Sequence, residues 1–161
     1  MFRILLPALL ASALAAVELP SGLFVAAAPA EAVDVIAART APKPGSAITV
    51  TGVVGGRLKP FVDGRAIFTI LDRSLICSTG CGSTWSGCGL PPEQLRDGVA
   101  TVQVADANGR PLAAALEGAS GLAPGSTVVI SGTVAPGSSD KALIVSASAI
   151  HVAPAAAAKP H

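Results

Sequence analysis

Three cysteines stand close together in the middle of the chain, in the segment C-S-T-G-C-G-S-T-W-S-G-C-G that begins at Cys77. Cys77, Cys81 and Cys88 are separated by three and then six residues. Clustered thiols can oxidise to a disulfide or, as thiolates, hold a soft metal ion such as Zn²⁺ or Cu⁺. The segment contains no C-x-x-C pair, so we do not expect a redox motif of that kind.

We expect one disulfide among these cysteines, because a bridge would restrict the unfolded state of a loop rich in glycine and serine. The pairing that we favour joins Cys77 or Cys81 to Cys88, and the remaining thiol could cross-link a second chain. The alternative is a thiolate metal site with His151 or His161 as the fourth ligand. Three cysteines at this spacing form an incomplete zinc set, so we predict no metal and no cofactor.

A second group of residues, mostly before the cysteine loop, could bind a ligand. Its cations could hold phosphate or carboxylate groups, and its rings could pack against a ligand. The candidate ligand-binding residues are Arg57, Lys59, Phe61, Arg65, Phe68 and Trp85. Asp63 stands among the cations, so an ordinary solvated loop also accounts for their charge. Trp85 could instead cover the barrel end or pack against the disulfide.

No catalytic constellation is evident in the sequence. The carboxylates mostly flank turns, where turn and cap geometry accounts for them. There is no phosphate loop, nucleophile elbow or H-E-x-x-H motif. His151 stands alone on an apolar segment and is expected to be a half-buried strand residue. We therefore expect that the protein is not an enzyme.

Length and composition narrow the class of protein further. The chain has 161 residues and a formal net charge of +1, with 51% hydrophobic, 13% charged and 3% aromatic residues. The length fits one domain with additional ends. The near-neutral charge gives no electrostatic attraction to duplex nucleic acid or anionic lipid, and the few aromatic residues argue against base stacking. Nucleic acid is therefore not an expected partner.

The N-terminus has the order of a secretory signal. A basic start at Arg3 precedes an uncharged run, Ile4 to Val17, that is too short for a stable membrane span. Small residues offer cleavage near residue 15 or near residue 30, so we assign residues 1–30 to a signal peptide. The mature protein is then expected to be periplasmic or secreted, with no membrane span.

The rest of the chain divides into a linker, a domain and a tail. Residues 31–46 include Pro42-Lys43-Pro44-Gly45 and are expected to be an extended linker. Residues 47–152 are expected to be the folded domain. Residues 153–161 are rich in alanine and proline, and we expect them to be a disordered tail.

Five strand-like runs separated by turn signals lie in the domain. They cover residues 48–54, 66–71, 99–105, 127–134 and 142–152. β-Branched residues and period-2 alternation support them, and Asn108-Gly109 is a strong turn signal. Between the third and fourth runs, Pro111 to Gly118 is expected to form a short helix, with proline first and glycine last. The fold class is therefore predicted to be all-β.

The strand order and the glycine-bent first strand resemble the OB-fold, a five-stranded Greek-key barrel. The segment from Gly121 to Val134, followed by a last strand ending in Ile150-His151-Val152, is similar to the C-terminal half of small exported bacterial OB-fold proteins. The insertion from Ser74 to Gly98, which carries the cysteines, departs from that plan. The resemblance implies a ligand surface on the second and third strands, flanked by the loops after the first and fourth strands.

Together these observations predict an exported, non-enzymatic OB-like binding module with a disulfide-stabilised loop. Its partner is expected to be a protein or a component of the cell envelope. Two alternatives remain: an OB domain that binds oligonucleotides or anions through Arg57, Lys59, Arg65 and Phe68, and a thiolate metal-binding protein.

Overall fold

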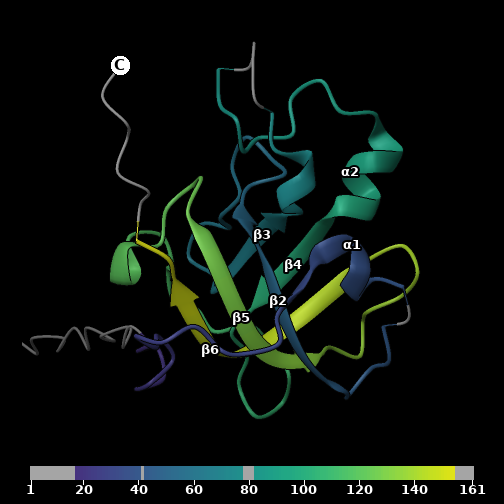
Figure 1. Ribbon diagram of the computed structural model, residues 1–161. Helices are drawn as coiled ribbons and strands as arrows, with labels where there is room; N and C mark the ends of the chain where they lie inside the picture. The colour runs from purple at the N-terminus through teal and green to yellow at the C-terminus, as the bar shows by residue number, and fades with distance from the viewer. Residues whose placement is uncertain (1–16, 41, 78–81, 155–161) are drawn as a thin grey trace, which may run out of the picture.

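Five strands close into a small barrel (Figure 1). The computed structural model describes residues 17–40, 42–77 and 82–154. The barrel strands are β2 (Ala47–Val54), β3 (Ile67–Leu71), β4 (Val99–Gln103), β5 (Thr127–Val134) and β6 (Leu143–Val152). The predicted all-β, OB-like barrel is confirmed, and each barrel strand falls on one of the five runs expected from the sequence.

The barrel is closed by one parallel and one antiparallel pairing. Its strands follow one another in the order β2, β3, β4, β6, β5, and β5 then pairs with β2. β4 and β6 are parallel, with Ala100 opposite Leu143, whereas β2 and β5 are antiparallel along seven residue pairs. The apolar positions of the strands face inward and form a core that includes Phe68, Ile130 and Ile150, all fully buried.

The connection between β4 and β5 corrects one prediction. Residues 111–118 are not helical, and the helical turn in this connection is the 3-10 turn η2 (Ala119–Gly121). Leu112 instead uses its backbone in the sheet: its N–H donates to Val104 and its carbonyl accepts from Ala66. Because the segment extends the sheet edge in this way, its backbone groups are not available for a helix. Leu116 and Leu122 complete the core from this connection.

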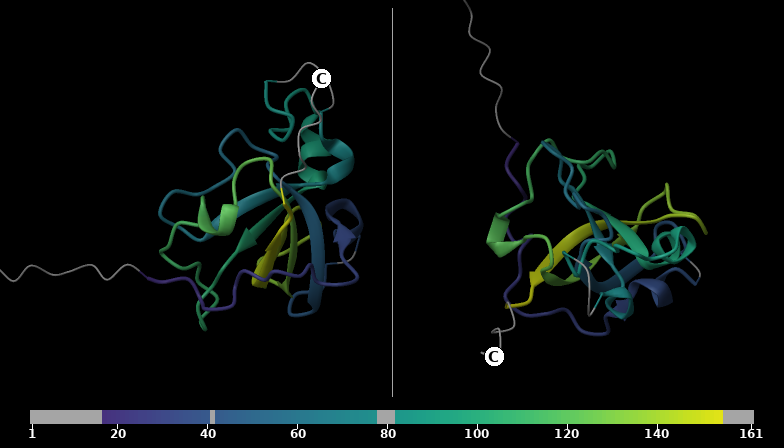
Figure 2. Two further views of the ribbon diagram at one scale, coloured as in Figure 1. Left: turned by 60° about the vertical axis from the view of Figure 1, so that its left-hand side comes forward. Right: turned by 90° about the horizontal axis from the view of Figure 1, so that it is seen from above.

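The insertion between β3 and β4 carries two helical elements. The 3-10 turn η1 (Arg73–Leu75) follows β3, and helix α2 (Pro92–Gly98) leads directly into β4. Pro92 at the start of α2 and Glu93 in its first turn suit a helix N-terminus. Both views in Figure 2 show α2 outside the barrel wall, on the same side as the shorter helix α1 (Val35–Ala38).

Residues 20–38, which we call the N-terminal strap, pack along the barrel. β1 (Val33–Asp34) pairs in parallel with β2 at Val50 and Thr51, and α1 follows at once. The side chain of Val35 is fully buried in the core. This part of the predicted linker is therefore ordered structure, because it covers an edge of β2 and fills a space in the core.

The strap also contacts the last strand. Phe24 pairs with Ile150, and the Val25 N–H and the Leu23 carbonyl exchange hydrogen bonds of 2.9 and 2.7 Å with the backbone of Ile150. Nδ1 of His151 lies 3.1 Å from the carbonyl oxygen of Val25. These contacts hold residues that the longer of the two expected signal peptides would remove. Residues 1–16 and 155–161, which carry most of the predicted signal and tail, lie outside the described residues.

We predict that Leu23→Ala destabilises the barrel strongly, because Leu23 is only 2% exposed and belongs to the core. A buried Leu→Ala change costs roughly 2–4 kcal/mol of unfolding free energy. Leu58→Ala is the matched control, since Leu58 is 77% exposed, and its effect should stay within about 0.5 kcal/mol. Urea unfolding of both variants measures the difference. Equal effects of the two substitutions would show that the strap does not contribute to the core.

Candidate anion-binding site

A cavity of about 400 Å³ opens on the outer side of β4 and is bordered by residues from six elements and loops. They come from the end of α1, the β2–β3 loop, α2, β4, the β5–β6 loop and the first residue of β6. We call this cavity the basic cleft. Its lining residues are Arg39, Gly56, Arg57, Pro92, Leu95, Arg96, Val99, Thr101, Lys141, Ala142 and Leu143.

Four of the lining residues are cations: Arg39, Arg57, Arg96 and Lys141. No carboxylate, cysteine or histidine stands among the described residues that line the cleft. Guanidinium and ammonium groups bind phosphate and carboxylate through charge-assisted hydrogen bonds. The lining is therefore suited to an anionic group.

Carboxylates flank the cleft without lining it. Nε of Arg96 lies 3.0 Å from a carboxylate oxygen of Asp97, and this hydrogen bond raises the pKa of Arg96. Glu93 and Asp140 are also near enough to raise that pKa further. Positive charge is therefore concentrated in the lining of the cleft, and the carboxylates at its border partly offset this charge.

Arg39 is the most constrained of the four cations. Its Nη1 donates to the carbonyl of Val99 at 3.1 Å, and its Nη2 donates to the carbonyl of Asp140 at 3.0 Å. Burial is the main cause of the lowered pKa of this guanidinium, which remains protonated. These two bonds join the end of α1 to β4 and to the β5–β6 loop, and they leave other guanidinium N–H groups for a ligand.

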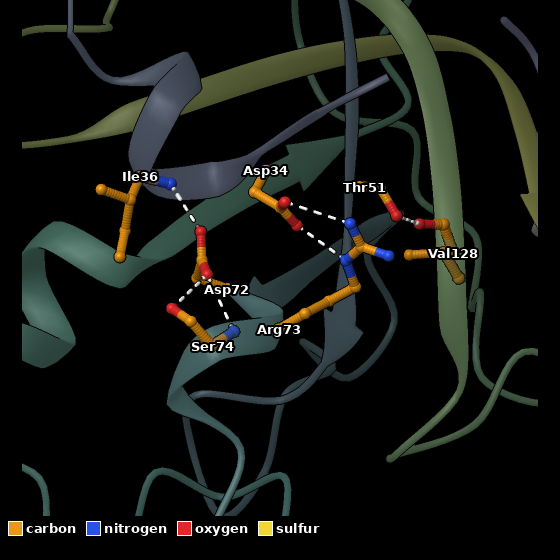
Figure 3. A network of polar contacts seen from close by, with 7 residues as sticks. All are labelled: Asp34, Ile36, Thr51, Asp72, Arg73, Ser74 and Val128. Atoms are coloured by element: carbon orange, nitrogen blue, oxygen red, sulfur yellow. Dashed lines mark hydrogen bonds and ion pairs between the residues drawn. The ribbon is translucent and has the colours of Figure 1, made fainter. Parts of the chain in front are cut away.

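A polar network fixes the helix that precedes Arg39 (Figure 3). Asp72, only 2% exposed, accepts hydrogen bonds from the Ile36 N–H at 2.8 Å and from the Ser74 N–H and hydroxyl at 3.0 and 2.7 Å. Arg73 binds both carboxylate oxygens of Asp34, at 2.7 and 3.0 Å. The two neighbouring residues at the end of β3 therefore hold β1 and α1 in place.

The insertion forms one wall of the cleft. The carbonyl of Trp85 accepts a 2.8 Å hydrogen bond from the Gly56 N–H. A Cβ atom on Gly55 would collide with that same carbonyl, so the close approach of the insertion to the β2–β3 loop requires glycine at this position. The side chain of Leu95, on α2, lies directly against Gly87. These contacts seat α2 beside the β2–β3 loop.

The predicted binding residues do not share one site. Arg57 lines the basic cleft, whereas Lys59 and Phe61 line a smaller cavity of about 280 Å³ on the same loop, together with Asp63 and Glu117. Arg65 is exposed and lines neither cavity. The cations of the β2–β3 loop therefore do not act as a single cluster.

The two remaining aromatic candidates, Phe68 and Trp85, pack within the protein and line neither cavity. Phe68 is 0% exposed and belongs to the barrel core, where its ring lies 5.7 Å from that of Phe61. It cannot reach a surface ligand, so its place among the binding candidates is corrected. Trp85 is half-buried, packs near Gly55 and Gly125, and positions the wall of the cleft through its backbone.

Sequence reasoning missed three of the four cations of the cleft, Arg39, Arg96 and Lys141. Each is a single basic residue in a different segment, and about 40 or more residues separate them along the chain. No local motif joins them. The one available signal was the resemblance to the OB-fold, which placed a ligand surface beside the loop that contains Lys141.

The cysteine loop is described only in part. Cys77 is half-buried and Cys88 is exposed, and no disulfide joins these two residues. Cys81 lies outside the described residues, so a bridge that includes it stays a prediction. Within residues 17–40, 42–77 and 82–154, no group of three or more Cys, His, Asp or Glu side chains is placed to hold a metal ion.

Comparisons with protein families, with curated proteins and with solved structures find no match to this chain. The fold and the cleft therefore define the class of the protein by themselves, as a small OB-like barrel with a basic surface cavity. In the described part of the chain, the helices are all too short or too polar to cross a lipid bilayer.

The ion pair between Asp34 and Arg73 should show a pH-dependent contribution to stability. The hydrogen bond from Arg73 holds the pKa of Asp34 below its ordinary value of 3.8. A lowered carboxyl pKa stabilises the folded state above pH 3.8, and this stabilisation is lost as the pH falls through the lower folded-state value. Because both side chains are partly exposed, a double-mutant cycle of Asp34→Asn and Arg73→Gln should give a coupling energy of about 0.2–1 kcal/mol at pH 7. The coupling should weaken as the pH falls through the lowered folded-state pKa of Asp34, and a coupling that stays constant as the folded protein is acidified would contradict this assignment.

Gly55→Ala should displace the insertion from the β2–β3 loop, because the new methyl group meets the Trp85 carbonyl. Trp85 is the single tryptophan of the chain, so its fluorescence reports this change directly. We expect a shift of the emission maximum and a lower midpoint of thermal unfolding. Gly82→Ala is the matched control within the same insertion, since a Cβ atom there meets nothing within 4 Å. Identical spectra for the two variants would show that the contact does not seat the insertion.

Proposed function

We propose that the protein is an exported, non-enzymatic OB-like binding module whose basic cleft holds an anionic group of its ligand. The observation that carries the proposal is the set of four cations, Arg39, Arg57, Arg96 and Lys141, that line one cavity. The cavity lies beside β4, between the β2–β3 and β5–β6 loops. The ligand surface of an OB-fold has the same place relative to its strands and loops.

Binding rather than catalysis accounts for the chemistry of the lining. Thr101 is its one hydroxyl-bearing residue, and no histidine or carboxylate stands among the described lining residues to act as a base toward it. Arg39 already uses two of its N–H groups to bind backbone carbonyls, which fixes it before a ligand arrives. A preorganised guanidinium loses less conformational freedom on binding, which favours affinity.

Export is supported by the signal-like N-terminus and places the module in the periplasm or outside the cell. The strap favours the earlier of the two cleavage positions, because cleavage near residue 30 would remove Leu23, which belongs to the core. An anion-bearing component of the cell envelope, or a protein with an exposed acidic group, is then the partner that fits.

The proposal takes up the anion binding of the first alternative, whereas oligonucleotide binding and a thiolate metal site receive less support. No aromatic residue stands among the described residues that line the basic cleft, so the stacking on which single-stranded nucleic acid binding depends is missing there. A thiolate metal site would require Cys81, which lies outside the described residues.

Titration with inorganic phosphate at low ionic strength, followed residue by residue through backbone amide NMR signals, tests the proposal. We expect saturable shifts at Gly56, Thr101 and Lys141, because these residues line the cleft. The double variant Arg57→Ala/Arg96→Ala should weaken binding at least about tenfold, since each substitution removes a charged hydrogen-bond donor.

The matched control is Arg65→Ala/Arg110→Ala, which removes the same charge from exposed positions outside the cleft. It should bind phosphate nearly as well as the unaltered protein. Equal weakening in both double variants would mean that phosphate responds only to net charge, and the proposed function would then be wrong.

A further inference from the structure

Resting on the proposed function, we infer that the ligand of the basic cleft is a small amphiphilic anion, with one anionic head and a short aliphatic body. A polyanion such as an oligonucleotide does not fit the same observations. Two features carry the inference: the apolar part of the lining, and the carboxylates that flank the cations.

The apolar part of the lining stands beside the cations. Leu95 and Val99 are half-buried, and Leu143 is buried below them, with Pro92 and Ala142 completing this side. Leu95 is held by its contact with Gly87, and Val99 is fixed by its pairing with Leu71 at the start of β4. Aliphatic side chains fixed in this way offer a surface for a methylene chain, and each methylene buried there should increase affinity about fourfold.

The flanking carboxylates limit the amount of negative charge that the site can accept. Asp97 and Asp140 act on both Arg39 and Arg96, and Glu93 acts on Arg96. All three carboxylates lie beside the cleft. Because physiological salt screens charges only over distances of about 8 Å, these carboxylates would repel negative groups of a ligand that extend past the cleft. A single anionic head in the cleft meets the four cations, whereas a chain of phosphates would continue past these carboxylates.

The insertion gives the cleft a closed side. Pro92, Leu95 and Arg96 all belong to α2, an element that the five-stranded barrel does not need for its closure. The insertion contacts the β2–β3 loop through the Trp85 carbonyl and the Gly56 N–H, and α2 and this loop both border the cavity of about 400 Å³. This volume falls within the roughly 300–1,000 Å³ that small-molecule sites occupy.

Phosphate monoesters and carboxylates share the chemistry that this site would recognise, because both accept paired hydrogen bonds from guanidinium groups. The probes for the test are therefore hexyl phosphate, hexanoate, inorganic phosphate and a ten-residue oligothymidylate, each titrated into the unaltered full chain and followed by the amide signals of Gly56 and Thr101. We expect hexyl phosphate or hexanoate to bind at least tenfold more tightly than inorganic phosphate. The tighter of the two identifies the head group.

Two variants test the apolar contact. Val99→Thr nearly keeps the shape of the side chain but makes it polar, and it should lower the ratio of hexyl phosphate affinity to inorganic phosphate affinity about threefold. Leu95→Ala should lower the same ratio and serves as a second variant if the first one folds poorly. Val129→Thr is the matched control, because Val129 is a half-buried strand residue of β5 that does not line the cleft.

The outcomes separate this inference from the proposed function. If inorganic phosphate and hexyl phosphate bind equally in the cleft, the aliphatic part of the inference is wrong and anion binding stands. If the oligothymidylate shifts the same signals at lower concentration, the site accepts polyanions and the inference is overturned. If no probe shifts these signals, both the inference and the proposed function fail.

Discussion

The closure of the barrel around β2 is the constraint on which the rest of the structure depends. β2 pairs with β5 along its first seven residues, but with β3 only at Val53 and Val54. Gly52 lies just before that short pairing, where a Cβ atom would stand 2.8 Å from the carbonyl oxygen of Leu71. Since a strand must bend to serve both neighbours in so small a barrel, glycine at this position lets β3 approach.

The same geometry explains the role of the N-terminal strap. Because β3 leaves β2 early, the backbone of Val50 and Thr51 has an uncovered edge, which β1 fills in parallel. An open strand edge invites pairing with another chain, so covering it also protects the barrel. The strap ends with α1, and Arg39, the residue that follows it, lines the basic cleft. The segment that completes the barrel therefore also positions part of the candidate site.

The sequence predicted the barrel much better than the site. The alternation and the turn residues located all five barrel strands, since local propensity and burial agree there. The helix expected at residues 111–118 was wrong, because Leu112 uses its backbone groups to extend the sheet. Of the predicted binding residues, Arg57 lines the basic cleft and Phe68 is core. Some residues of a strand run are exposed and others are buried in the core. The pattern of residue types alone did not show which of the predicted binding residues are buried.

By itself, the sequence determined the strand content and the position of the long connection between β3 and β4, because these follow from local propensity and turn chemistry. Only the tertiary structure decided which cations share a cavity. Arg39, Arg57, Arg96 and Lys141 come together because β4 pairs in parallel with β6 and because the strap and the insertion pack on the same side of the barrel. Such a site has no local signature in the sequence, since the packing of distant segments decides whether a charged residue belongs to it.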